Sequence, residues 1–591
     1  MIYQNNFHSS SQSFTTFQSN LAASTTSSYP TILGITNNDD SSACLLVNGK
    51  IISAVQEERF SRIKLDNRWP QNSIAYVLNE ANIKLSDVDY LAYGWSTGFN
   101  ADKLLLKYLD RSRELAEKPK AWLHFRKRIS NEIYNDRDKR NEFLNFARIN
   151  GFEGKTLFID HHTAHSLGAY CCSPYKDALI VTCDGRGDFR SFTISKMQNG
   201  LYSTLHEELT HDSLGYFYGR ITHLLGHKPN RHEGKVTGLA ARGNPNKCKD
   251  LMRQMIDCKD GKIRANLGKW YEPSYKGYSD VLIEKIRQFD SKDIAAAAQE
   301  HLEYIICSII QKYIPYQSSV NLCLAGGVFG NVRLNQKVRE LPNVNSVFVL
   351  PCMGDGGLSL AAAVAASYTR FGIRCSLNTM SLGPSYDHKF NPAMIPEKIT
   401  AQCTEIEKEI IEAISTDKVV GFVRGRMEFG PRALCKRSII YHAKDTTVNN
   451  WLNKRLNRTE YMPFAPVTAE NLANKCYKRW KADDITSHYM TMTYNCTDFM
   501  NEKCPAVVHT DGTARPQIVS KNDDPFMYSL LNAWFKKTGE PALINTSFNR
   551  HEEPIINKPE EAFDALISKV VDLLCISDKY ILKRNSSAWQ R

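Results

Sequence analysis

The sequence predicts an α/β protein of two domains that meet near residue 385. Three segments, near Asp184, Gly326 and Gly356, pair an apolar strand-like run with a glycine-rich turn, which suggests a duplicated nucleotide-binding architecture. A hairpin signal near the start of the chain, followed by a helix and a strand, is typical of an α/β domain. The length of 591 residues exceeds one hydrophobic core and favours two or three domains.

Composition excludes several classes of protein. Apolar residues make up 42% and charged residues 23%, the balance of a folded chain. The longest apolar runs, such as 360–366, fall far short of the roughly 18 residues that a membrane span needs. The 16 cysteines show no Cys-x-x-Cys spacing, so we expect reduced thiols in a cytoplasmic protein. The net charge of +12 favours anionic ligands such as phosphates, but it is spread too widely to predict nucleic-acid binding.

The N-terminal domain, residues 31–385, is expected to begin with a hairpin, a helix and a strand. Asn48 and Gly49 separate two apolar runs and accept the positive φ angles of a hairpin turn. Ser73 is placed to cap the helix that follows. Strand-like runs lie at 31–35, 43–47, 51–55, 90–93, 156–159, 178–182, 189–194, 320–324 and 346–350.

Three other segments have a character of their own. Residues 1–30, rich in Ser, Thr, Gln and Asn, predict a disordered tail. Residues 101–150 are basic, with Leu and Phe at helical intervals, and predict a helical insertion. A solvated face is the commoner explanation of such a segment, and a surface for substrate or partner is the alternative. Residues 386–591 form a second α/β domain, in which we expect a helix at 405–415 and a strand at 419–423.

The segment His161-His162-Thr163-Ala164-His165 is the sharpest local signal. On a helix, His161 and His165 lie one turn apart on one face and can share a metal ion, although such a pair alone is more often structural. Asp184 and Asp355 lie in glycine turns at strand ends and would complete the metal shell. Two imidazoles and two carboxylates suit iron(II), manganese or zinc. His162 is expected to point elsewhere.

Cationic and amide side chains form three further candidate groups. Lys235, beside glycines, is placed to reach a phosphate or carbonyl oxygen, and a surface lysine at a helix start is an equally frequent alternative. Arg432 and Arg437 lie in a cation-rich segment opened by Gly-Pro, which suits a phosphate or carboxylate; a solvated basic turn is the alternative. Asn545 and Asn549 follow a strand and would read a carbamoyl or purine edge, unless they only close a loop.

Nine motifs occur in a fixed order along the chain. They are Glu57–Arg62, His161–His165, Asp184–Gly187, Glu233–Ala240, Ala325–Val328 with Asn335, Gly354–Gly357, Gly430–Leu434, Pro463–Pro466 and Asn545–Asn549. With these motifs the chain, over about residues 31–585, resembles the NodU/CmcH family of O-carbamoyltransferases, which includes the tobramycin carbamoyltransferase. The resemblance implies an N-terminal domain similar to the tRNA threonylcarbamoyl transferase, with an actin-like, duplicated ribonuclease-H-type core, and a YrdC-like C-terminal domain.

The resemblance also implies a reaction. The C-terminal domain would join carbamoyl phosphate and ATP, with its Mg²⁺, into carbamoyl-adenylate, and the N-terminal domain would pass the carbamoyl group to a hydroxyl of a small-molecule natural product or sugar. The family's metal, commonly Fe(II), would be held by His161, His165, Asp184 and Asp355. Residues implied to bind the adenylate, carbamoyl phosphate or ATP are Gly326, Gly327, Asn331, Asn335, Gly356, Arg432, Arg437, Asn545 and Asn549.

Three residues are assigned a catalytic part: Asp39, Lys235 and Arg432. Asp39 stands where family members usually have a histidine, and its carboxylate would accept the proton of the substrate alcohol as a weaker base than imidazole. Lys235, together with the metal, would stabilise the negative charge that develops during transfer.

The chain departs from the family at four other positions. Met462 stands where arginine is usual, Asn457 where lysine is common, and Cys435 and Glu552 where glycines are usual. The two lost cations would bind carbamoyl phosphate or ATP. Cations placed to compensate are Lys436, Lys454, Arg455 and Arg458.

Two other functions stay open. One is a divergent family member with an altered donor, a single half-reaction or a non-catalytic role, which the replacements at Asp39, Asn457 and Met462 would explain. The other is a tRNA threonylcarbamoyl transferase, which the N-terminal motifs and the charge suggest, but the second domain and the lack of a concentrated basic module count against it. The insertion and the aromatic residues of 270–278 are candidates for the acceptor pocket. A homodimer is one of the assemblies compatible with the sequence.

Overall fold

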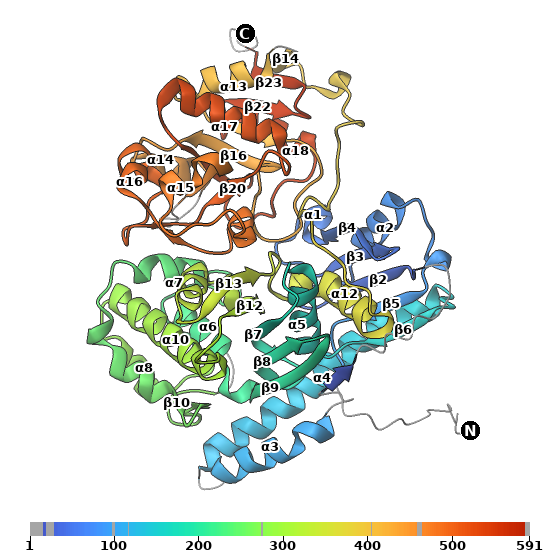
Figure 1. Cartoon of the computed structure of the whole chain (residues 1–591), viewed down its shortest axis with the longest axis vertical. Helices are drawn as coiled ribbons and strands as arrows, with labels where there is room; N and C mark the ends of the chain where they lie inside the picture. The colour runs from blue at the N-terminus through green and yellow to red at the C-terminus, as the bar shows by residue number, and fades with distance from the viewer. Residues whose placement is uncertain are drawn as a thin grey trace.

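The computed structural model describes residues 16–18, 29–96, 101–115, 118–272, 276–402, 405–457 and 464–585. The predicted disordered tail lies outside the described residues, except for 16–18 and 29–30. Against that prediction, residues 16–18 form a short strand, because they pair with residues 201–203. Figure 1 shows an N-terminal domain built on two sheets and a C-terminal domain built on one larger sheet.

The two N-terminal sheets repeat one strand order. Their strands are β2 (Ile32–Thr36), β3 (Ser42–Val47), β4 (Lys50–Gln56), β5 (Tyr90–Tyr93) and β6 (Lys155–Phe158) in the first, and β7 (Ala178–Gly187), β8 (Arg190–Gln198), β9 (Leu201–Leu209), β12 (Val320–Ala325) and β13 (Val344–Val349) in the second. The orders are β4-β3-β2-β5-β6 and β9-β8-β7-β12-β13, with β1 (Thr16–Gln18) at the edge beside β9. In each sheet two antiparallel pairs are followed by two parallel pairs. The predicted duplication is confirmed.

Two helices lie between these sheets. Helix α5 (His161–Cys172) follows β6, and α12 (Leu358–Phe371) follows β13. They pack on one another, and α12 contacts β2, β3 and β5, whereas α5 contacts β7, β8 and β12. Each half therefore covers the sheet of the other half. Gly168 permits this packing, because a Cβ atom there would lie 2.7 Å from the Cβ of Ala361.

Other helices cover the outer faces of the N-terminal domain. The predicted insertion is helical, with α3 (Ala101–Leu115) and α4 (Pro119–Ile149). The ring of Phe143 on α4 stacks on Tyr93 of the first sheet at 4.9 Å between centroids. The remaining elements are α1 (Glu58–Ser61), α2 (Gln71–Glu80), α6 (Leu214–Leu224), α7 (Glu233–Ala240), α8 (Lys249–Met255), β10 (Ile256–Lys259), β11 (Lys262–Ala265), α9 (Asp280–Ile286), α10 (Ser291–Tyr313) and α11 (Val332–Arg339).

The C-terminal domain is a mixed eight-stranded sheet with helices on both faces. Its elements are β14 (Ile399–Gln402), α13 (Ile406–Ser415), β15 (Val420–Val423), β16 (Arg437–His442), α14 (Val448–Arg455), β17 (Ala465–Ala469), α15 (Glu470–Cys476), β18 (Tyr494–Asn495), α16 (Asp498–Lys503), β19 (Thr513–Ala514), β20 (Gln517–Val519), α17 (Pro525–Thr538), β21 (Ala542–Ser547), α18 (Pro559–Ile567), β22 (Leu573–Ile576) and β23 (Tyr580–Arg584). The order is β14-β23-β22-β15-β16-β21-β17-β20. Separate apolar clusters fill the two faces, one of them under α13 and α17. The predicted α/β class is confirmed.

Two local predictions need correction. Helix α2 begins at Gln71, and Ser73 is not its cap: the hydroxyl of Ser73 donates to the buried Glu57 carboxylate at 2.8 Å. The segment that begins at Asp184 is not a glycine turn, because β7 continues through it. The turn follows at Asp188 and Phe189, which adopt φ values of 44° and 69°.

The remaining local predictions agree with the structure. Asn48 and Gly49 form the hairpin turn, with φ values of 52° and 71°. Every cysteine within the described ranges is a free thiol. Among the helices that the structure describes, none combines the length and the apolar character needed to cross a bilayer.

The domains meet along the turn that contains Gly430 and Arg432. The Gly430 carbonyl accepts from Arg59 at 2.8 Å, and its N–H donates to Gln56 at 3.2 Å. On the other side Arg432 donates to the Gly330 carbonyl at 3.2 Å. The turn is thereby fixed against both halves of the N-terminal domain.

Candidate metal centre and anion site

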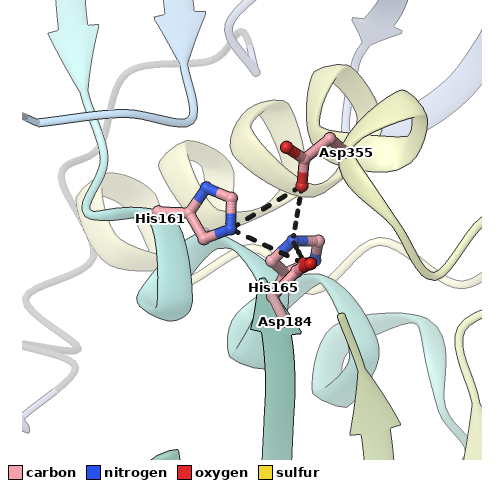
Figure 2. Close-up of side chains that lie close together, drawn as sticks. All are labelled: His161, His165, Asp184 and Asp355. Carbon is pink, nitrogen blue, oxygen red and sulfur yellow. Dashed lines mark ion pairs between the residues drawn. The ribbon is translucent and has the colours of Figure 1, made fainter. Parts of the chain in front are cut away.

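Four side chains from distant parts of the chain converge between the two N-terminal sheets (Figure 2). His161 and His165 lie on the first turns of α5, Asp184 lies in β7, and Asp355 lies in the short turn before α12. The Nε2 atom of His165 lies 3.5 Å from Asp184 and 3.6 Å from Asp355, and that of His161 lies 3.9 Å and 3.7 Å from the same carboxylates. The structure therefore brings together all four predicted ligands.

Local structure fixes the orientation of these groups. Asp160 caps α5 by accepting from the Thr163 N–H at 2.9 Å, so the helix begins where the first histidine stands. The Asp184 carboxylate accepts from the N–H groups of Gly185 and Gly327 at 2.8 and 3.0 Å. Gly187 leaves room for the His161 ring.

The donor set fits a divalent cation. Both histidine rings are fully buried. Among the residues that the structure describes, neither ring nitrogen of either histidine has a hydrogen-bond partner, and Oδ1 of Asp355 also lacks one. Burial alone would lower the pKa of His165, but the Asp184 and Asp355 carboxylates outweigh burial and raise it to about 9. The same imidazoles hold the pKa of Asp184 far below its usual range, against the effect of burial. The carboxylates thus favour a positive charge here, and a metal ion supplies one.

His162 turns away from this cluster, as expected. It is buried, and its Nδ1 lies 2.6 Å from the Thr182 hydroxyl.

The helical insertion forms part of the wall beside the metal centre. The Trp95 ring lies 4.2 Å from the His161 ring, centroid to centroid, and the Arg186 guanidinium lies over Trp95 at 5.1 Å. Asp136 on α4 holds Arg186 at 2.6 Å. The insertion is therefore more than a solvated face, because one of its buried carboxylates orients a cation next to the metal ligands.

Asp39 lies on the loop between β2 and β3, on the same side as the metal centre. Although solvent reaches the residue, the crowding of protein around its carboxylate and then the negative charges of Asp355 and Asp184 raise the pKa of Asp39 to about 6. Arg186 opposes this rise. Asp39 is thus a stronger base than an ordinary aspartate. Asn230 donates to it at 3.5 Å.

The three glycines predicted to bind the adenylate lie where the backbone passes very close to neighbouring groups. A Cβ atom on Gly326, where φ is 97°, would lie 2.3 Å from the Cys183 carbonyl oxygen. On Gly327 it would approach Asp184, and on Gly356 it would lie 2.4 Å from Asp40.

Lys235, Asn331 and Asn335 have separate surroundings. Lys235 lies on the first turn of α7, with its ammonium shielded from solvent. Asn331 caps α11 and exchanges hydrogen bonds with Gln299. Asn335 is buried and donates to the carbonyls of Phe329 and Thr491, both at 2.7 Å. The amide groups of both asparagines therefore support the protein framework.

A pair of half-buried arginines forms a second candidate site at the domain interface. Protein packed around the guanidinium lowers the pKa of Arg432 to about 10, and the same effect, followed by the charge of Arg432, holds the pKa of Arg515 well below its usual range. Within the described ranges, no carboxylate forms an ion pair with either. Two cations this close, without an acid, are an electrostatic cost that a bound phosphate or carboxylate would remove.

Asn545 lies at this arginine pair. Its amide donates to the Gln517 side chain at 2.7 Å and to the Ala433 carbonyl at 3.1 Å, and its buried Oδ1 has no partner in the described segments. Arg432, Arg515 and Asn545 therefore share one region between β16, β20 and β21.

Family models match both parts of the chain. The model described as Carbamoyltransferase N-terminus matches residues 31–364, and that described as Carbamoyltransferase C-terminus matches residues 411–583. The chain belongs to the carbamoyltransferase family.

Relatives of this carbamoyltransferase include nodulation proteins. Nodulation protein NolNO of Sinorhizobium fredii is 31% identical and the match covers 93% of this chain and 80% of that protein. Nodulation protein U of Rhizobium tropici is 34% identical over 68% of this chain and 74% of that protein. Among solved structures, (R)-2-hydroxyglutaryl-CoA dehydratase component A of Acidaminococcus fermentans gives a TM-score of 0.33 at 14% identity, covering 58% of this chain and 98% of that chain.

Two predicted residues of the carbamoyltransferase lie apart from the arginine pair. The Arg437 guanidinium is fully buried and donates to backbone carbonyls, among them those of Asn557, Arg424 and Pro384. The N–H groups of Arg437 therefore bind the protein backbone instead of a ligand. The amide of Asn549 donates to the Arg550 and Glu553 carbonyls. It lines a separate cavity of about 280 Å³.

Arg515 is not among the residues predicted from the sequence, and two of the four cations placed to compensate are paired with carboxylates. Lys436 pairs with Asp524 at 2.7 Å, and Arg455 pairs with Asp572 at 3.0 Å. Arg458 and Met462 lie outside the described residues. The segment from His509 to Arg515, a glycine turn followed by a cation, carried a usable signal of the kind that singled out Arg432.

Proposed function

We propose that this carbamoyltransferase moves the carbamoyl group of carbamoyl phosphate, through a carbamoyl-adenylate, to a hydroxyl of a small-molecule natural product or sugar. The observation that carries the proposal is the convergence of His161, His165, Asp184 and Asp355 beside a base of raised pKa, Asp39. The unpaired arginines at the domain interface support the use of anionic donors.

The first half-reaction would take place at the arginine pair. It consumes carbamoyl phosphate, ATP and one water, and it releases phosphate and pyrophosphate to leave carbamoyl-adenylate. Arg432 and Arg515 would bind the phosphate oxygens, with Mg²⁺ accompanying ATP. The partnerless Oδ1 of Asn545 would accept from the carbamoyl NH₂.

The second half-reaction would take place at the metal centre. The four ligands would hold a divalent ion, Fe(II) by family resemblance, which when bound polarises the carbamoyl carbonyl. Asp39 would accept the proton as the substrate oxygen bonds to the carbamoyl carbon, and the bond to AMP would break. Lys235 would balance the negative charge that develops on the leaving phosphate.

Two separate readouts test this proposal. Purified chain given ATP, carbamoyl phosphate and Fe(II) should release pyrophosphate, and Arg432→Gln should suppress this release. Asp39→Asn should keep pyrophosphate release but abolish products heavier by one carbamoyl group, as detected by mass spectrometry. Asp110→Asn, an equal charge change at an exposed position of α3, is the control. No pyrophosphate from the unmodified chain would refute the adenylation half.

The metal assignment has its own test. His161→Ala and Asp355→Ala should lower the bound metal and carbamoyl transfer together, whereas His488→Ala, outside the cluster, should change neither. Full metal occupancy in both ligand variants would contradict the assignment.

A further inference from the structure

A cavity of about 420 Å³ lies between the end of α6 and the loop that leads to α7. This α6–α7 pocket falls in the lower part of the size range of small-ligand sites. Its lining residues are His223, Gly226, His227, Lys228, Pro229 and Lys276. Four of the six are basic and none is acidic.

A single carboxylate beside the pocket is shared by several basic groups. Glu552, from the C-terminal domain, contacts Lys228 at 2.8 Å, Arg231 at 3.1 Å and His232 at 2.7 Å. One carboxylate thus faces two permanent cations and an imidazole. Lys276 is exposed at the pocket and forms no ion pair within the described part of the chain. A pocket with this excess of positive charge attracts anions.

A glycine turn and a side-chain hydrogen bond shape the pocket wall. Gly226, with φ of 82°, turns the chain after α6. The Nδ1 atom of His223 lies 2.9 Å from the Tyr278 hydroxyl, which fixes the imidazole. The contacts of Glu552 hold the other side of the loop.

The same loop reaches the candidate transfer base. Asn230, two residues after Lys228, donates to the Asp39 carboxylate at 3.5 Å. Two residues span at most about 7 Å of extended chain. One small molecule could therefore place a hydroxyl at Asp39 and an anionic group in the pocket.

We infer that the α6–α7 pocket binds a phosphate group of the acceptor, so that the acceptor is a phosphorylated sugar or a sugar nucleotide. This inference rests on the proposed transfer at Asp39. Lys276 and Lys228 would bind the phosphate oxygens, with His227 as an additional donor.

Calorimetric titration of the full chain with glucose 1-phosphate, UDP-glucose and pyrophosphate tests the inference, with glucose as the neutral control. At least one of the two phosphorylated sugars should bind, and glucose should not. In the Arg432→Gln chain, where the other anion site is weakened, that sugar should bind more tightly than pyrophosphate. Lys276→Glu should weaken that binding at least tenfold. Lys269→Glu, the same charge reversal at an exposed position outside the pocket, should leave it unchanged, and so should Arg432→Gln at the other anion site.

Several results would overturn the inference: no binding of either sugar phosphate, equal loss in both lysine variants, loss only in Arg432→Gln, or, in the Arg432→Gln chain, tighter binding of pyrophosphate than of the sugars. This outcome is separable from that of the proposed function. The titration needs neither ATP nor carbamoyl phosphate, and pyrophosphate release needs no acceptor.

Discussion

Gly187→Ala should prevent metal binding at the candidate metal centre, although it replaces none of the four candidate ligands. A Cβ atom at this position would lie 1.9 Å from Cδ2 and 2.3 Å from Cγ of His161. Ordinary contact begins at 3.4 Å, so the ring must withdraw by about 1.5 Å. Metal–nitrogen distances tolerate only about 0.2 Å. His161 can therefore no longer coordinate the metal ion. The loss of metal affinity should exceed the roughly 10- to 100-fold loss that follows when a residue hydrogen-bonded to a metal ligand is removed.

The assay compares metal affinity with folding. We expect affinity for Fe(II), measured anaerobically by competition with a chromophoric chelator, to fall at least 100-fold. The free energy of unfolding should fall by only about 1–3 kcal/mol, the usual cost of overpacking. Gly234→Ala is the matched control, because its Cβ atom would meet no atom within 4 Å. Unchanged metal affinity in Gly187→Ala would show that His161 is not a ligand in this position.

Three further predictions follow from charged groups. Arg515→Gln should raise the KM for carbamoyl phosphate, measured by pyrophosphate release, by about 10- to 100-fold, because it removes a hydrogen bond to a charged group. The thermal midpoint should not fall, and an unchanged KM would exclude Arg515 from the donor site. Asp136→Asn should cost about 3 kcal/mol in urea unfolding, because it leaves Arg186 without its partner; a loss below 1 kcal/mol would refute this role. Burial would raise the pKa of Glu552, but its cationic neighbours outweigh burial and hold that pKa at about 2, below the ordinary 4.5. The ionised carboxylate therefore stabilises the folded protein fully above about pH 4.5, and this stabilisation is lost as the pH falls towards 2. Glu552→Gln should therefore lower the thermal midpoint at pH 7 but not at pH 2, and an equal loss at both values would contradict the shift.

The convergence of the four candidate ligands could be predicted because its signals are local. His161 and His165 lie one helical turn apart, and each aspartate has glycine neighbours. Only long-range packing decides the rest. Nothing in the string around Arg437 reveals that its guanidinium is saturated by backbone carbonyls, or that Arg515 lies beside Arg432. These facts depend on which strands of the eight-stranded sheet become neighbours.

Contacts between distant residues explain the two errors in the fold. Ser73 matches the preferred residue of a helix start, but the buried Glu57 carboxylate needs its hydroxyl, and the tertiary contact prevails. Glycines after Asp184 indicated a turn. Instead, the glycine at position 187 leaves β7 without a side chain where the His161 ring packs against it. Two non-glycine residues, Asp188 and Phe189, form the left-handed turn.

The short turn from Gly327 to Gly330 joins the two chemistries. Its first N–H donates to Asp184, a candidate metal ligand, and its last carbonyl accepts from Arg432, which is proposed to bind the anionic donor. Under the proposed reaction, a mixed anhydride formed on one side needs to travel only the width of this turn before it is consumed on the other. This easily hydrolysed species would then not have to diffuse through bulk water. Any displacement of Arg432 by a bound donor would be transmitted through the turn to Asp184.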